Sequence, residues 1–225
     1  MIKIFSKLNK KKFFYIGKQR CGTKSFGDFF RKNNYKIFSW PEIRDSGIND
    51  LYWSGRWIDI LKSDIIKNYD VFEDGPFQHP LFAKFLYANL NSSHFVFLER
   101  SPSDWFDSMI KHSDGYTLGN IDKHCFLYSR LSELNDVYIE NPNCKKLPII
   151  HMREKYESIY LEHKFQVLDL FKNSKPGRFF AGDLYDDSVY KKISDFFNLN
   201  LKNTETQHSH KSNKDLKSIL NKFNI

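Results

Sequence analysis

Four short apolar runs, each followed by a stretch with helical spacing, dominate the pattern of hydrophobic and polar positions along the chain. The runs are FFYIG (13–17), YDVFE (69–73), HFVFLE (94–99) and RFFA (178–181). The helical stretches after them cover residues 24–33, 80–90, 103–111 and 188–197. Apolar strands without polar alternation, separated by helices, are typical of a parallel sheet covered on both faces. The pattern therefore predicts an α/β fold with a central parallel sheet flanked by helices in three layers.

Weaker patterns predict the remaining elements. Residues 35–38 are consistent with a further short strand, and residues 49–67 and 124–138 with helical connections. A long helix is predicted over 152–171, because apolar and His side chains recur there at steps of three and four residues. These side chains are Tyr156, Ile159, Tyr160, His163, Val167, Leu170 and Phe171. After a polar stretch (202–213), residues 214–223 predict a short amphipathic helix.

Composition is consistent with one domain over residues 1–225, with a core at about 13–200 and a basic C-terminal tail at 201–225. The formal charge of +8 favours an anionic partner, although a coding bias toward Lys would give the same charge.

Three widely spaced cysteines suggest neither a disulfide framework nor a zinc site. No secretory signal and no apolar stretch of about 20 residues occurs, which predicts a soluble cytoplasmic protein without stable membrane insertion.

The segment GKQRCGTKS, residues 17–25, lies where the first strand gives way to a helix. Backbone N–H groups and the positive end of a helix dipole converge on an anion at such a place. Gly22 permits close approach of the backbone, while neighbouring Arg, Thr, Lys and Ser side chains supply further donors. The Walker A pattern GxxxxGK[ST] fits Gly17 and Gly22 but not the next position, because Thr23 is inserted before Lys24. The segment therefore predicts a phosphate loop that differs from the ATP-binding type.

RCGTKS resembles the 5′-phosphosulfate loop of sulfotransferases that use 3′-phosphoadenosine-5′-phosphosulfate (PAPS), in particular their bacterial-type branch, although the family commonly has Lys where this chain has Arg20. The resemblance implies a three-layer P-loop-like fold, PAPS as co-substrate, its desulfated form PAP as product, and no metal. It also implies that Arg20 stabilises the oxygen bridging phosphate and sulfur. The implied donor-binding residues in this loop are Arg20, Cys21, Gly22, Thr23, Lys24 and Ser25.

A second resemblance to the same family lies in HFVFLERSPSDWFDSMIKH, where Ser108 follows Arg100 by eight residues. In that family an Arg at a strand end and a Ser on the next helix bind the 3′-phosphate of the donor, and the resemblance implies this role for both residues. DVFEDGPF (70–77) and YESIYLEHKFQVLDLF (156–171) also resemble segments of that branch. The resemblance spans about residues 13–200.

Sulfuryl transfer needs a base that takes the proton of the attacking acceptor group. Family patterns place this base just after the strand at 69–73, which implies either Asp74, in the better-matching D-x-P-F turn, or Glu73. Both acids are also typical of helix caps or ion-pair partners. His163 is a further candidate base or acceptor contact.

Three other interpretations remain open. The first is a P-loop kinase that uses ATP and Mg²⁺, and the second is a basic nucleic-acid-binding module, which lacks a matching motif. The third is a sulfotransferase fold that binds the nucleotide without turnover. The favoured prediction is sulfuryl transfer to a hydroxyl or amine of a small-molecule or carbohydrate acceptor, with no nucleic acid as partner. The sequence carries no signal for acceptor identity or oligomeric state.

Overall fold

The structure of the protein is a computed structural model that describes residues 11–118, 124, 146–205 and 214–223. The chain divides into two compact units, one comprising Met1–Glu99 with Lys164–His210 and the other Arg100–His163 with Lys211–Ile225. The boundary falls inside the long helix α10 (Arg153–Phe171), which contributes to both units. The single domain predicted over residues 1–225 stays a prediction.

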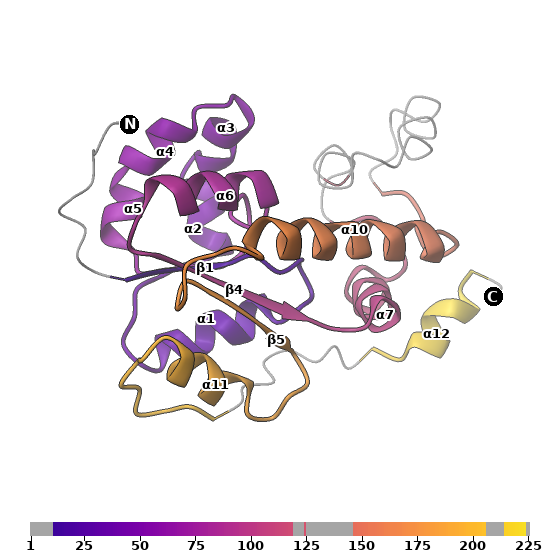
Figure 1. Ribbon diagram of the computed structural model, residues 1–225. Coiled ribbons are helices and arrows are strands. Elements are labelled where there is room, and N and C mark those ends of the chain that lie inside the picture. Colours follow the sequence, from indigo (N-terminus) through magenta and orange to yellow (C-terminus); the bar gives the residue numbers. More distant parts are fainter. Residues whose placement is uncertain (1–10, 119–123, 125–145, 206–213, 224–225) are drawn as a thin grey trace. The chain divides into compact units, whose positions relative to one another are not determined.

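The first unit is built on five parallel strands in the order β2-β3-β1-β4-β5, which confirms the predicted central parallel sheet. Figure 1 labels three of these strands, β1, β4 and β5. The strands are β1 (Lys12–Tyr15), β2 (Ile37–Phe38), β3 (Val71–Phe72), β4 (Ser93–Glu99) and β5 (Phe179–Asp183). Each of the five lies in or overlaps a run that the sequence predicted as a strand. The fold class is therefore α/β, consistent with a three-layer P-loop-like fold.

Helices cover both faces of the sheet, because successive side chains of each strand point to opposite sides. On one face, Phe13, Val71 and Val96 pack with side chains of α1 (Thr23–Arg31) and α11 (Val189–Phe196). On the other face, a ring stack crosses three strands: Phe14 lies 4.7 Å from Phe72 and 5.4 Å from Phe95 between ring centroids. Burying each such ring stabilises the fold by about 2 kcal/mol.

The helices on this second face are α2 (Trp40–Asp45), α3 (Ile48–Trp53), α4 (Trp57–Lys62), α5 (Asp64–Asn68) and α6 (Pro80–Asn89), with the end of α10 (Figure 1). The predicted helical connection at 49–67 is thus three short helices. Helix α2 was not predicted. It begins with a capping box in which the Ser39 N–H donates to Glu42 Oε2 at 3.1 Å, with Pro41 in its first turn.

The second unit contains α7 (Pro102–Ser113), the first part of α10, and α12 (Leu216–Asn221). Trp105 of α7 is fully buried and stacks on Tyr160 of α10 with ring centroids 5.1 Å apart. α12 packs near the end of α7, where Lys214 forms an ion pair with Asp114 at 2.7 Å. The predicted helix at 124–138 lies outside the described residues except for position 124.

Within the ranges that the structure describes, no helix is both long enough and apolar enough to cross a bilayer.

Candidate phosphate-binding loop and its surroundings

The loop from Ile16 to Gly22 leaves the carboxyl end of β1, between its two neighbours β3 and β4. From β1 the chain continues to β2, toward one edge of the sheet. From β4 it continues to β5, toward the opposite edge. The boundary between β1 and β4 is therefore a topological switch point, and ligands of open α/β sheets bind outside the carboxyl ends of strands at such a point. The fold thus positions the predicted phosphate loop where this class of sheet binds its ligands.

Two residues of the loop have a left-handed backbone conformation, which shapes its turn. Arg20 has φ 70° and Gly22, the N-cap of α1, has φ 90°. A side chain at Gly22 would be strained by this φ and would also overlap Leu184, which explains the glycine. Inside the turn, the buried Tyr15 hydroxyl donates to the Cys21 carbonyl, and the Cys21 N–H donates to the Lys18 carbonyl at 3.1 Å. The turn is therefore held by its own backbone and by β1.

The predicted donor-binding side chains of the loop have different environments. Thr23 and Arg20 are half-buried, Lys24 is exposed, and Ser25 and Cys21 are buried. The first turn of α1 contains no acidic residue. Helical geometry leaves the first N–H groups of α1 without an intrahelical acceptor. This end of α1 therefore combines backbone donors that have no acceptor within the helix with positive charge, which suits an anion.

Glu73 directly follows β3 and is 6% exposed, with its Oε2 buried and without a hydrogen-bond partner. Its carboxylate lies against the backbone of α1 at Gly27, where a Cβ atom would overlap Oε2. Burial raises the pKa of Glu73 to about 8; the charges of Asp74 and Asp28 add to this, while Arg31 and the Gly27 backbone oppose it. Glu73 is thus mostly a neutral acid at pH 7.

Asp74, the preferred base, has a left-handed backbone with φ 69°. Its Oδ1 accepts a hydrogen bond from the Gly75 N–H at 2.8 Å, and part of its surface stays exposed. Desolvation raises the pKa of Asp74, although the bond from Gly75 partly opposes this. Asp74 and the loop both follow carboxyl ends of paired strands, β3 and β1, so they lie at the same sheet edge.

His79 is a candidate that the sequence prediction missed. It precedes Pro80 as the N-cap of α6, and its ring stacks on Tyr52 at 4.9 Å and meets Trp53 edge-on at 5.2 Å. Its Nε2 is buried without a hydrogen-bond partner. Burial, and secondly the charge of Lys18 in the loop, lower the pKa of His79 to about 4. The signal in the sequence was a His-Pro pair that opens a helix soon after a strand.

In the second unit, Arg100 follows the last residue of β4 and Ser108 lies half-buried on α7. The Arg100 N–H donates to the Tyr160 hydroxyl at 3.0 Å, and that hydroxyl donates to the Arg100 carbonyl at 2.9 Å. One side chain of α10 therefore holds both backbone polar groups of Arg100.

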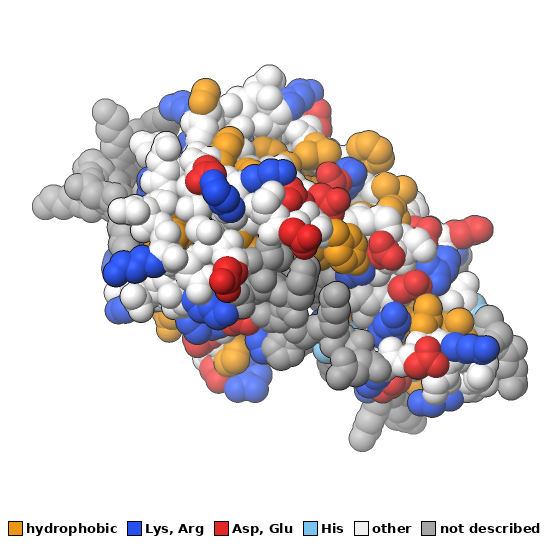
Figure 2. Space-filling model, turned by 90° about the horizontal axis from the view of Figure 1, so that it is seen from below, with side chains coloured by type: hydrophobic (Ala, Val, Ile, Leu, Met, Phe, Trp, Pro, Cys, Tyr) orange, Lys and Arg blue, Asp and Glu red, His pale blue; other side chains and the backbone are white. Residues whose placement is uncertain are grey.

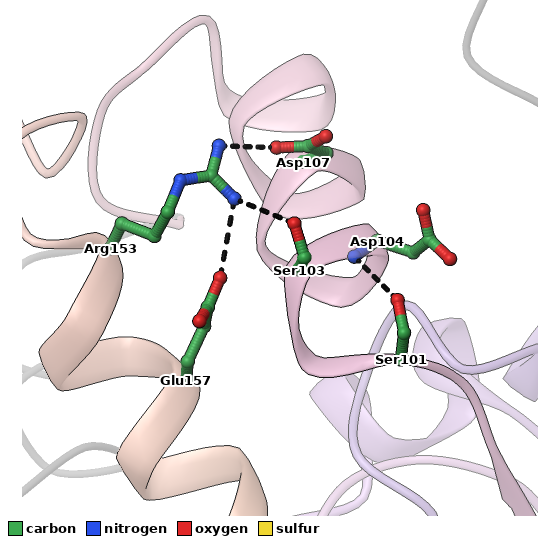
Figure 3. A network of polar contacts seen from close by, with 6 residues as sticks. All are labelled: Ser101, Ser103, Asp104, Asp107, Arg153 and Glu157. Atoms are coloured by element: carbon green, nitrogen blue, oxygen red, sulfur yellow. Dashed lines mark hydrogen bonds and ion pairs between the residues drawn. The ribbon is translucent and has the colours of Figure 1, made fainter.

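A polar network around Arg153 connects α10 to α7 and includes Asp107, the residue before Ser108 in the sequence (Figure 3). Arg153 donates to Asp107 at 2.6 Å, to Ser103 at 3.2 Å and to Glu157 at 3.3 Å. Its guanidinium also lies 4.8 Å from the centroid of the Phe106 ring. These polar contacts hold α7 against α10 in addition to the apolar contact between Trp105 and Tyr160.

His163, the third predicted base, is buried on α10 one turn after Tyr160. The predicted residues thus form two groups. The first unit brings the loop at 20–25, Glu73 and Asp74 to one sheet edge, and the second unit contains Arg100, Ser108 and His163. Among the described residues, no cluster of three or more His, Cys, Asp or Glu side chains could hold a metal ion, and the absence of a metal stays a prediction.

Comparison with known proteins adds no family to this picture. A scan against protein-family models finds no match to the chain, and a search of curated proteins finds no similar sequence. The sulfotransferase relationship therefore stays a resemblance carried by the loop and by the Arg100 segment.

Proposed function

We propose that the protein transfers a sulfuryl group from PAPS to a hydroxyl or amine acceptor and releases PAP. The observation that carries this proposal is the loop at residues 16–22. It lies at the switch point of a parallel sheet, has a glycine-dependent turn, and leads into a helix whose first turn has no acid. An anionic phosphosulfate suits this position, and the residue pattern RCGTKS resembles a PAPS loop rather than an ATP loop.

The proposed reaction asks the protein to align two groups and to stabilise charge. The acceptor atom attacks sulfur, the bond from sulfur to the bridging oxygen breaks, and its electron pair stays on the phosphate of PAP. Arg20 and Lys24 stabilise the negative charge that grows on that oxygen, together with the N–H groups at the start of α1. Arg100 and Ser108 bind the 3′-phosphate in this proposal.

The proton of the acceptor goes to a base near the loop. Asp74 is the first candidate, because it lies at the same sheet edge as the loop, part of its surface stays exposed, and desolvation raises its pKa, which makes the carboxylate more basic. Glu73 fits less well, since its carboxylate is buried against α1 and mostly protonated at pH 7. His79 is a second candidate, because a bound anion beside Lys18 would offset one of the two effects that lower its pKa.

Surface charge gives the nucleic-acid alternative little support. On the face in Figure 2, Lys and Arg side chains alternate with Asp and Glu instead of forming a continuous basic stripe. Several lysines are paired with acids on their own helix, such as Lys191 with Asp195 at 2.6 Å and Lys67 with Asp64 at 2.8 Å. Nucleic-acid interfaces favour clustered basic patches.

The deciding experiment is calorimetric titration of the protein with PAP and, separately, with ATP and Mg²⁺. The proposal expects PAP to bind without metal at micromolar strength or better, and ATP to bind much more weakly. Tight Mg²⁺-dependent binding of ATP with no response to PAP would overturn the proposal in favour of the kinase.

A pair of glycine variants tests the loop itself. Gly22→Ala places a side chain at φ 90° in the proposed phosphate site, and Gly47→Ala does the same at φ 69° at the N-cap of α3, where no atom lies within 4 Å of the new Cβ. Both lose a left-handed glycine, but only Gly22→Ala should weaken PAP binding, by tenfold or more. Equal PAP affinity in the two variants would contradict the assignment of the loop.

A further inference from the structure

Arg100 is held in the second unit by a pair of hydrogen bonds to one side chain. The Tyr160 hydroxyl accepts from the Arg100 N–H at 3.0 Å and donates to the Arg100 carbonyl at 2.9 Å, across 60 positions of sequence. The pairing of β4 with β5 ends at Glu99. Directly after it, the Tyr160 hydroxyl pairs with both the N–H and the carbonyl of the Arg100 backbone.

The Tyr160 ring is itself fixed. It is 1% exposed and stacks on the fully buried Trp105 at 5.1 Å with an interplanar angle of 28°. Rings in such a packed arrangement have one position, so the hydroxyl is presented to Arg100 at a set place. The backbone of Arg100, and hence the direction in which its side chain leaves the chain, is therefore defined by α10 and α7 together.

We infer that Tyr160 is the positioning residue for the 3′-phosphate contact of Arg100. This inference rests on the proposed function, because it gives Tyr160 a role only through the guanidinium of Arg100. A guanidinium binds phosphate best in a forked, directional geometry. Fixing the Arg100 backbone before the ligand arrives removes a part of the ordering cost of that contact.

The test compares two ligands that differ only in the 3′-phosphate: PAP and adenosine 5′-monophosphate (AMP). The ratio of their dissociation constants measures the contribution of the 3′-phosphate. In the parent protein PAP should bind more tightly than AMP, and Arg100→Met should remove most of this preference. Tyr160→Phe, which deletes one hydroxyl and keeps the ring on Trp105, should lower the preference by roughly five- to tenfold. AMP affinity should stay unchanged.

Tyr156→Phe is the matched control. Tyr156 lies one turn earlier on the same helix, is fully buried, and its hydroxyl bonds His124 Nε2 at 2.5 Å rather than Arg100. Both variants lose one buried hydroxyl, so a general loss of stability should affect them alike. Only Tyr160→Phe should lower the PAP preference. In the Arg100→Met background Tyr160→Phe should add nothing, because the two residues act through one contact.

The outcomes separate the two levels of the proposal. If the parent protein does not bind PAP more tightly than AMP, the proposed donor site is refuted, and the role of Tyr160 is refuted with it. If the parent prefers PAP, Arg100→Met loses that preference and Tyr160→Phe keeps it, the role of Tyr160 is refuted while the donor site stands. Should Tyr160→Phe not fold, Tyr160→Met, which also lacks the hydroxyl and keeps an apolar contact with Trp105, is measured in its place.

Discussion

Replacing Glu73 with Gln should stabilise the protein, increasingly so as the pH rises. The folded protein raises the pKa of Glu73 from 4.5 to about 8. Between these values the folded state binds a proton that the unfolded state has lost. The free energy of unfolding therefore falls as the pH rises through this window and levels off above about pH 8. Gln has nearly the same shape and no charge, so it avoids this loss.

The size of the effect follows from the pKa difference at about 1.36 kcal/mol per pH unit. Relative to the parent, Glu73→Gln should gain about 1 kcal/mol at pH 5, about 3 kcal/mol at pH 7 and about 5 kcal/mol at pH 9. Water screens the charge of Glu73 little, because the residue is only 6% exposed. Urea unfolding of both proteins at the three pH values measures the difference.

Glu42→Gln provides a control of opposite sign. Burial alone would raise the pKa of Glu42, but the hydrogen bonds from Ser39 outweigh it and lower this pKa. A lowered pKa stabilises the folded state above the unfolded pKa and loses that effect as the pH falls. Glu42→Gln should thus destabilise at pH 7 by about 1 kcal/mol. A gain for Glu73→Gln that does not change with pH would refute the argument.

Three further variants test separate contacts. Gly27→Ala should destabilise by about 1–3 kcal/mol, because its Cβ overlaps Glu73 Oε2, and most of this loss should vanish in a Glu73→Ala background when both are unfolded in urea. Asp74→Asn should keep the PAP affinity of the parent and lower sulfuryl transfer at least a hundredfold if Asp74 is the base, as measured with labelled PAPS. Arg153→Met should destabilise by only about 1 kcal/mol, since its ion pair with Asp107 is partly exposed, and high salt should shrink the difference.

The sequence predicted the class and the positions of the sheet because its strands are apolar on both faces and separated by helices. It did not predict α2, although the signal was present. Ser39 and Glu42 have the spacing of a capping box, and Pro41 suits the first turn of a helix. The sequence analysis assigned a short strand to 35–38 and no element to the residues directly after it, so these two start signals were missed. Strand lengths were overestimated at 35–38 and 69–73, where pairing covers only two residues each.

The environments of the candidate residues could not be predicted, because they depend on contacts between distant segments. Glu73 becomes a neutral acid since Gly27, 46 positions earlier in the sequence, brings the α1 backbone onto its carboxylate. Tyr160 reaches Arg100 across 60 positions. Local patterns describe neither contact. They located the loop and the strand ends, which are set by neighbouring residues.

A neutral Glu73 is consistent with the use proposed for the neighbouring loop. Its carboxylate touches α1 at Gly27, five residues after the N-cap Gly22, and an ionised group there would oppose an anion at the start of the helix. Because burial keeps the proton on Glu73 at pH 7, no negative charge of this residue offsets the positive charges of Lys18, Arg20 and Lys24. The contact of Glu73 with α1 would then weaken the positive electrostatic field at the loop only slightly, and binding of a phosphosulfate depends on that field.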